Sequence, residues 1–135
     1  MGDLADIRPA LATALAPIAG LRSTLRSDQL NTPCVEIGWP TRIDFDEDED
    51  DDATYTIPIR VWIGLADNRA SADLLQGYMA KTGSKSIRAA LETDTKLGGK
   101  CESLRVTAMT GSGADEAETG GPAYLVADWE VQIFA

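Results

Sequence analysis

The 135-residue sequence contains no histidine and only two cysteines, Cys34 and Cys101. Histidine is the commonest general base in enzymes and a usual ligand of zinc. The two cysteines stand far apart in the sequence, without the CxxC spacing of a structural zinc site. The sequence therefore disfavours catalytic triads and zinc mechanisms. In a reducing compartment we expect both cysteines to be small buried side chains rather than a disulfide pair.

The N-terminal segment lacks the basic start and continuous apolar stretch of a secretory signal. Asp3, Asp6, Arg8 and Pro9 interrupt residues 1–20. No apolar run elsewhere approaches the ~20 residues that are needed to span a bilayer. We therefore expect a soluble protein that is made in the cytoplasm and has no membrane partner.

The formal net charge is −10, with 22 acidic and 12 basic residues, but this acidity is concentrated in one place. Eight of the acidic residues lie between Asp44 and Asp52, so the rest of the chain carries only −2. Binding to nucleic acid needs lysine and arginine clustered against phosphates, which this balance disfavours. The length fits one domain, which we place at residues 1–135.

The first part of the chain predicts one helix followed by two short extended segments. Asp3 or Asp6 can cap the helix, and Pro17 with Gly20 should kink or end it. Apolar residues recur along it at the spacing of one helical stripe: Leu4, Ile7, Leu11, Leu15 and Ile18. We expect this helix to cover a sheet whose first strands lie at residues 34–38 and 42–45.

The clearest strand pattern runs from Thr54 to Gly64. Alternation places Tyr55, Ile57, Ile59, Val61 and Ile63 on one face and Thr54, Thr56, Pro58, Arg60 and Trp62 on the other. Because Pro58 has no N–H for a ladder hydrogen bond, its side of the strand is predicted to be an edge or a bulge. This strand and the segment 42–45 flank an acidic hairpin tip at residues 46–52.

Two helices and two strands complete the predicted order. Asp67 or Asn68 starts a helix with the packed face Leu74, Leu75, Tyr78 and Met79. Ser84 or Ser86 caps a second, short helix with Ile87, Ala90 and Leu91, which Gly98 and Gly99 stop. A strand at residues 101–110 places Leu104, Val106 and Ala108 inward, and a last strand places Leu125, Ala127, Trp129, Val131 and Ile133 inward.

This order of elements predicts an α+β fold, with a mainly antiparallel sheet packed by an N-terminal helix and two central helices. The loop at residues 111–122 is glycine-rich and acidic and has no apolar anchors. We expect it to be a mobile hairpin loop in an isolated subunit. An arm that orders against a partner is the alternative.

The acidic run consists of Asp46, Glu47, Asp48, Glu49, Asp50, Asp51 and Asp52. Compared with an EF-hand, Asp44, Asp46 and Asp48 occupy ligand positions, but Glu49 replaces the turn glycine and Tyr55 the bidentate glutamate. We therefore favour a solvated, self-repelling loop over a metal site. A third interpretation is a surface along which a polyanion slides without sticking.

The glycines form neither a P-loop nor a GxGxxG fingerprint, and no pair of carboxylates stands out as an acid and base. We expect no enzyme activity, no cofactor and no bound metal. Trp129 belongs to an apolar strand face and is predicted to lie in the core. Arg60 and Trp62 lie opposite the isoleucines, where either a helix or a neighbouring subunit can cover them.

The pattern as a whole resembles the tail-terminator proteins of long-tailed, siphovirus-type bacteriophages, especially those of actinobacteria. The resemblance covers nearly the whole chain and rests on structural signatures without a catalytic motif. These are the helix from Leu4 to Ile18, the strand from Tyr55 to Gly64 with its continuation from Leu65 to Ala72, the helix with Leu74, Leu75, Tyr78 and Met79, the segments 86–92 and 97–99, and the strands 104–106 and 123–134. The long acidic tip is not expected of every member of that family.

The resemblance implies a small subunit that forms a ring, commonly of six copies, at the head-proximal end of the tail. Such a ring ends tail-tube growth and joins the tail to the head connector or stopper protein, while DNA passes through without specific binding. The protein would then be a virion component that is assembled in the host cytoplasm. Our hypothesis places Arg60, Trp62 and Tyr124 among the ring contacts.

Two other functions remain open from the residues alone. One is another head-to-tail connector component, an adaptor or stopper, although two helices between the strand sets disfavour the strand-dominated stopper. The other is a small acidic enzyme or divalent-cation-binding module that uses Asp44 to Asp52.

Overall fold

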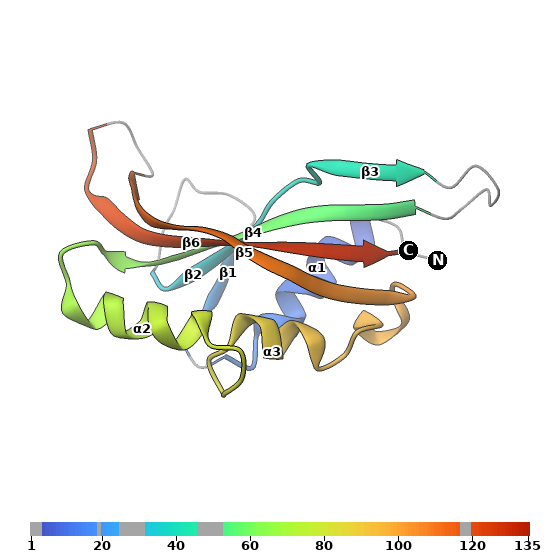
Figure 1. Cartoon of the computed structure of the whole chain (residues 1–135), viewed down its shortest axis with the longest axis horizontal. Helices are drawn as coiled ribbons and strands as arrows, with labels where there is room; N and C mark the ends of the chain where they lie inside the picture. The colour runs from blue at the N-terminus through green and yellow to red at the C-terminus, as the bar shows by residue number, and fades with distance from the viewer. Residues whose placement is uncertain (1–3, 19, 25–31, 46–52, 117–119) are drawn as a thin grey trace.

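The computed structural model describes residues 4–18, 20–24, 32–45, 53–116 and 120–135. In this part of the chain, three α-helices pack against a mostly antiparallel sheet, which confirms the predicted α+β fold (Figure 1). The elements in chain order are α1 (Leu4–Leu15), β1 (Arg22–Thr24), β2 (Cys34–Ile37), β3 (Arg42–Phe45), β4 (Ala53–Leu65), α2 (Arg69–Met79), α3 (Ile87–Glu92), the short 3-10 helix η1 (Leu97–Gly99), β5 (Ser103–Glu116) and β6 (Ala123–Phe134). No helix within these residues is both long and apolar enough to cross a membrane.

The six strands form one sheet in the order β1-β2-β4-β6-β5, and β3 pairs with β4 on the same side as β2, farther along the strand. Only β1 and β2 run parallel among the pairs of this sheet. The pairing of β3 with β4 confirms that two strands flank the acidic segment. Residues 46–52 themselves lie outside the described part of the chain. The three-residue strand β1 was not predicted from the sequence.

The helix-covered face of β4 and β6 forms the main core. Its side chains are almost completely buried, including Ile57, Ile59, Val61, Val131 and Ile133. Trp129 is also buried there, as predicted. The helices cover this face through Ile7, Leu11, Leu15, Tyr78, Ile87 and Leu91. The apolar side chains of the strands and those of the helices thus form one core between the sheet and the helices.

Pro58 lies where one neighbouring strand ends and the next begins, which is a gap in the pairing at the place where an edge or a bulge was predicted. β2 ends opposite Ile59, and β3 begins opposite Thr56. The Pro58 carbonyl accepts a hydrogen bond of 2.9 Å from the Gly38 N–H in the connection between β2 and β3. In an antiparallel strand the nitrogen of a residue points to the same side as its carbonyl, so the missing donor falls at this gap.

Bulges change which face some residues occupy. A register shift between Trp62 and Gly64 turns Gly64 toward α2, where a Cβ would lie 2.3 Å from Ser71 Oγ. A second shift, between Val106 and Ala108, leaves Ala108 exposed. The prediction that Ala108 points inward was therefore wrong, because an extra residue at a bulge reverses the alternation beyond it. Met109 packs against the core instead, opposite Trp129.

α2 and α3 begin at predicted caps. The Asn68 side chain accepts a hydrogen bond from the Ala70 N–H at the start of α2, and the Ser86 side chain accepts one from the Ala89 N–H at the start of α3. Tyr78 is buried, but Met79 is 41% exposed, so its assignment to the packed face of α2 was wrong. The reason is that the short α2 covers the sheet with one narrow stripe, and Met79 is its last residue.

The loop predicted at residues 111–122 is shorter than expected. Residues 111–116 continue β5 and pair with β6 as far as Glu116 opposite Ala123. The glycine-rich and acidic composition of residues 111–116 did not indicate that they form a strand paired with β6. Residues 117–119 lie outside the described part of the chain. Cys34 and Cys101 are both free and buried, as predicted.

Candidate functional site

The sheet face turned away from the helices brings together the three residues singled out from the sequence. The Arg60 Cζ atom lies 5.3 Å from the centre of the Trp62 ring. The rings of Trp62 and Tyr124 meet edge to face, with centroids 6.2 Å apart and an interplanar angle of 85°. Arg60 and Trp62 come from β4, and Tyr124 comes from β6. We call this group, with the acidic partners of Arg60, the outer-face cluster.

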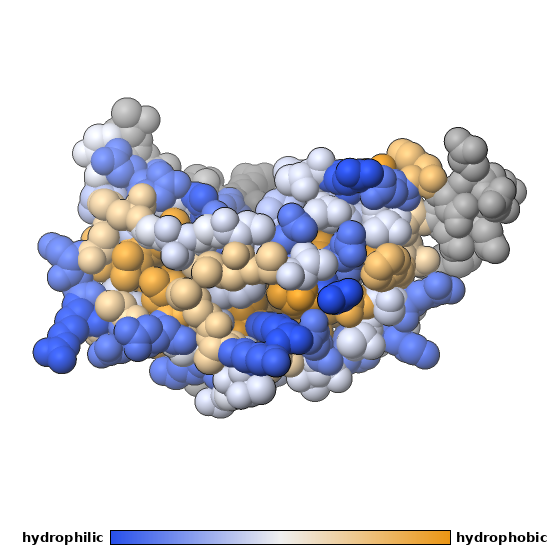
Figure 2. Space-filling model, viewed as in Figure 1, coloured by the Kyte–Doolittle hydropathy of each residue, from blue (hydrophilic) through white to orange (hydrophobic). Residues whose placement is uncertain are grey.

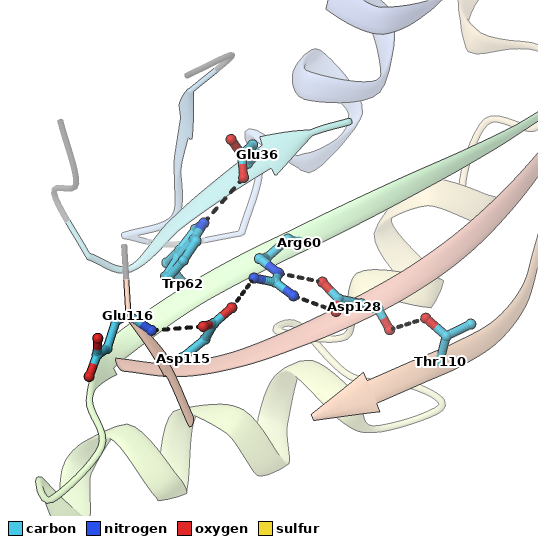
Figure 3. Close-up of polar contacts among 7 residues, drawn as sticks. All are labelled: Glu36, Arg60, Trp62, Thr110, Asp115, Glu116 and Asp128. Atoms are coloured by element: carbon cyan, nitrogen blue, oxygen red, sulfur yellow. Dashed lines mark hydrogen bonds and ion pairs between the residues drawn. The ribbon is translucent and has the colours of Figure 1, made fainter. Parts of the chain in front are cut away.

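Arg60 is held between two carboxylates (Figure 3). Its Nε and Nη2 donate to the two carboxylate oxygens of Asp128, at 2.8 and 3.0 Å, and its Nη1 donates to Asp115 Oδ2 at 2.6 Å. Asp128 lies directly opposite Arg60 in the pairing of β4 with β6, and the Glu116 N–H fixes Asp115 by donating to its Oδ1 at 2.8 Å. The guanidinium therefore has one fixed orientation.

These contacts keep the charges of the cluster in place. Hydrogen bonding to Asp128 raises the pKa of Arg60, against the opposing effect of burial, with a further contribution from Asp115. Hydrogen bonds from Arg60, and then from the Glu116 N–H, lower the pKa of Asp115. A guanidinium and a carboxylate shifted in these directions exchange no proton near neutral pH. The chemistry of the cluster is ion pairing and packing rather than proton transfer.

Trp62 supports this surface from within. Its side chain is 4% exposed and forms a small second core with Cys34 and Val126, against which Tyr124 packs. The Trp62 Nε1–H donates to Glu36 Oε1 at 3.4 Å, as Figure 3 shows. The sequence left open whether a helix or a neighbouring subunit covers Trp62. The helices lie on the other face of the sheet, and Trp62 is instead buried by residues of its own sheet. Of the three residues that the sequence singled out, a partner can reach only Arg60 and Tyr124, and both side chains are half-buried. That these residues contact a neighbouring subunit in a ring of copies stays a prediction.

The sequence did not identify the acidic partners of the cluster. Asp115 fell in the segment predicted as a loop, and the register that sets Asp128 opposite Arg60 depends on strand pairing rather than on local pattern. One signal was available, because Asp128 and Arg60 both occupy the polar face of an alternating strand. Opposite charges on two such faces are a common cross-strand pair.

The acidic run at residues 46–52 lies outside the described residues, and no metal site can be assigned to it from the structure. In the part that is described, no group of three or more acidic or cysteine side chains is placed to hold a metal ion. Asp44, the first residue of the partial EF-hand match, instead accepts a 2.9 Å hydrogen bond from the exposed Arg42.

No model of a known protein family matches the chain, and a search of curated proteins finds no matching relative. The function is therefore argued from the residues and their arrangement.

Proposed function

We propose that this protein is a structural subunit that assembles into a ring at the head-proximal end of a long phage tail, ends growth of the tail tube and joins the tail to the head connector. The observation that carries the proposal is the outer-face cluster, in which a fixed Arg60 and a half-buried Tyr124, supported by the buried Trp62, lie on a sheet face that the described helices leave uncovered. The sequence resemblance supplies the tail terminator as the particular kind of ring.

Two properties of the cluster support a role in assembly, and the charge of the whole chain agrees with it. Arginine and tyrosine, the types of the two residues that a partner can reach, are among those that contribute most to binding energy at protein interfaces. The ion pairs to Asp115 and Asp128 already fix Arg60, so a partner that binds it restricts little additional side-chain motion. Contacts between unlike surfaces of identical subunits form a ring when the rotation between copies closes. The net charge of −10 further disfavours adhesion of DNA that passes through such a ring.

The test is the native mass of the purified chain, alone and after mixing with the tail-tube protein encoded beside it. We expect a discrete ring, either alone or only at tube ends, and a shorter, narrower distribution of tube lengths when the protein is present. Arg60→Met should weaken ring formation. Arg105→Met is the matched control, because Arg105 is an exposed arginine of β5 for which no ion pair is found among the described residues.

A chain that stays monomeric and ignores tubes would contradict the proposal. Binding to a connector protein without formation of a ring would indicate the adaptor instead. Saturable binding of calcium or magnesium in a calorimetric titration, at low-micromolar concentration, would favour a cation-binding module that uses the acidic run.

A further inference from the structure

The two sides of the sheet end in strands of very different length. On one side the outer strands β1 and β3 have three and four residues, whereas on the other side β5 has 14. No further strand pairs with the outer side of β5 in the part of the chain that the structure describes. In Figure 1, β5 lies on the near side of the sheet, and Figure 2 shows apolar surface broken up by charged groups on this side. A long open edge is a place where a strand of another molecule can add.

One backbone donor of this edge is occupied by a side chain. The Ala135 N–H donates to the Ala53 carbonyl, so every second residue of β6 counted back from Ala135 directs its N–H and C=O toward β4. Val131 is one of these residues, and Val106 of β5 lies opposite it. The Val106 N–H therefore points away from β6, toward the open edge. There it donates to Glu92 Oε2 of α3 at 3.1 Å.

Glu92 is held in this position by a second contact. Its other carboxylate oxygen, Oε1, accepts a hydrogen bond of 3.2 Å from Arg88 Nε, one turn earlier in α3. Val106 is 8% exposed, so its N–H would be a buried donor without a partner if Glu92 were absent. The Glu92 side chain itself is 27% exposed and forms the surface over this donor. A carboxylate oxygen thus takes the place that the carbonyl of a neighbouring strand would have.

The rest of β5 is poorly suited to pairing with another strand. Two register shifts, in the ranges 106–108 and 109–111, interrupt its regular backbone. Bulges of this kind bend a strand and displace the donors and acceptors that a further strand would need. Acidic residues follow at 115–116, and charged side chains on an edge oppose pairing. The regular stretch before the first shift, residues 103–106, is the part that Glu92 covers.

We propose that Glu92 closes the edge of β5 against a second copy of this chain. Without Glu92, residues 103–106 of two copies would pair antiparallel about a twofold axis, because an edge that is open on one copy is open on every copy. The stretch contains Leu104 and Val106, and a β-branched residue such as valine suits a strand. This role goes beyond the proposed ring function, because it concerns an association of copies that the outer-face cluster does not make.

Glu92→Ala tests whether the side chain closes the edge. We expect this variant to reach a larger native mass than the unaltered chain in a dilution series, and to do so at concentrations at least about tenfold lower. Glu92→Gln is the matched control, since its amide oxygen can still accept from the Val106 N–H, and Arg88→Met removes only the ion pair. Both controls should associate like the unaltered chain. A folded Glu92→Ala that associates no more than Glu92→Gln would overturn the proposal.

Hydrogen exchange locates the contact and separates it from a merely structural cap. In dilute Glu92→Ala, the Val106 amide should exchange at least about tenfold faster than in the unaltered chain, and it should become protected again as the concentration rises. Fast exchange at every concentration would show a cap alone and would overturn the proposal. If Glu92→Ala does not fold, Glu92→Asp withdraws the carboxylate by one methylene and should show the same behaviour in weaker form. Neither readout uses tail tubes, so a failure here leaves the proposed ring function standing.

Discussion

The two faces of β4 are built from alternate residues of one strand but are stabilised in different ways. On the helix-covered face, Ile57, Ile59 and Val61 are fully buried among other apolar side chains, so burial alone holds them. On the outer face, Arg60 and Trp62 are held by ion pairs, an edge-to-face contact and a hydrogen bond. The difference indicates that the first face determines folding, while the second determines what the folded subunit presents.

The largest effect should come from the covered face. Ile59→Ala removes a fully buried side chain from the central strand and should lower the free energy of unfolding by about 2–5 kcal/mol, because the cavity cannot fully close. Urea unfolding that is followed by circular dichroism measures this loss as a lower midpoint with an unchanged slope. A loss below about 1 kcal/mol would contradict the view that this face carries the stability.

Trp62 should be the exception to this difference between the two faces, because it lies on the outer face and yet should contribute to stability as a core residue does. Although it lies on the outer face, it is 4% exposed, so Trp62→Ala should cost about 2–3 kcal/mol, somewhat less than in a large core because its cluster is small. Trp62→Phe is the control, since it keeps an aromatic ring beside Tyr124 and loses the hydrogen bond to Glu36. Urea unfolding again gives the measurement. Unchanged stability of Trp62→Ala with impaired assembly would instead support the hypothesis that Trp62 is one of the contacts between subunits of the ring.

Most of the architecture could be predicted from periodicity, because alternation in β4 and β6 and the helical stripe of α1 reflect burial on one side. The failures have local causes. Bulges displace Gly64 and Ala108 from the faces that alternation assigns them, and a single inserted residue leaves no trace in the pattern. Gly111 to Glu116 resembles a loop in composition, yet its backbone groups pair with β6.

The candidate site was predicted in part. Arg60, Trp62 and Tyr124 do share one face, because strand alternation is a local property that the sequence reveals. Their partners Asp115 and Asp128 depend on register between strands far apart in the chain, which the sequence does not encode locally. The burial of Trp62 was likewise hidden, since it arises from Cys34 and Val126 on two neighbouring strands.

At the bulge between Trp62 and Gly64 the alternation of β4 is reversed, so Gly64 lies on the helix-covered face. Gly64→Ala would place a Cβ 2.3 Å from Ser71 Oγ of α2, and we expect a loss of about 1–3 kcal/mol in the free energy of unfolding. Ser71→Ala removes the clashing oxygen and leaves the Ser71 Cβ at 3.4 Å from the added carbon. The double variant should therefore be more stable than the sum of the two single changes predicts, which a double-mutant cycle measures. Strict additivity would show that the contact with Ser71 Oγ is not the cause of the loss.

The smallest effect should come from the exposed end of the ion-pair cluster, through its dependence on pH. Arg60 and the Glu116 N–H lower the pKa of Asp115 below its usual value of 3.8 in the folded state. The charged form of Asp115 therefore stabilises the fold fully above the unfolded-state pKa, and this contribution disappears as the pH falls through the lower folded-state pKa.

Asp115→Asn should thus unfold at a lower urea concentration than the unaltered chain at pH 7. The difference between the two midpoints should shrink as the pH falls below about 4. Asp73→Asn is the control, because Asp73 is an exposed carboxylate of α2 for which no ion pair occurs among the residues that the structure describes, and its midpoint difference should stay small throughout. A difference for Asp115→Asn that persists unchanged at pH 3 would show that the pairing with Arg60 does not act through charge, and the outer face would then be held by packing as the covered face is.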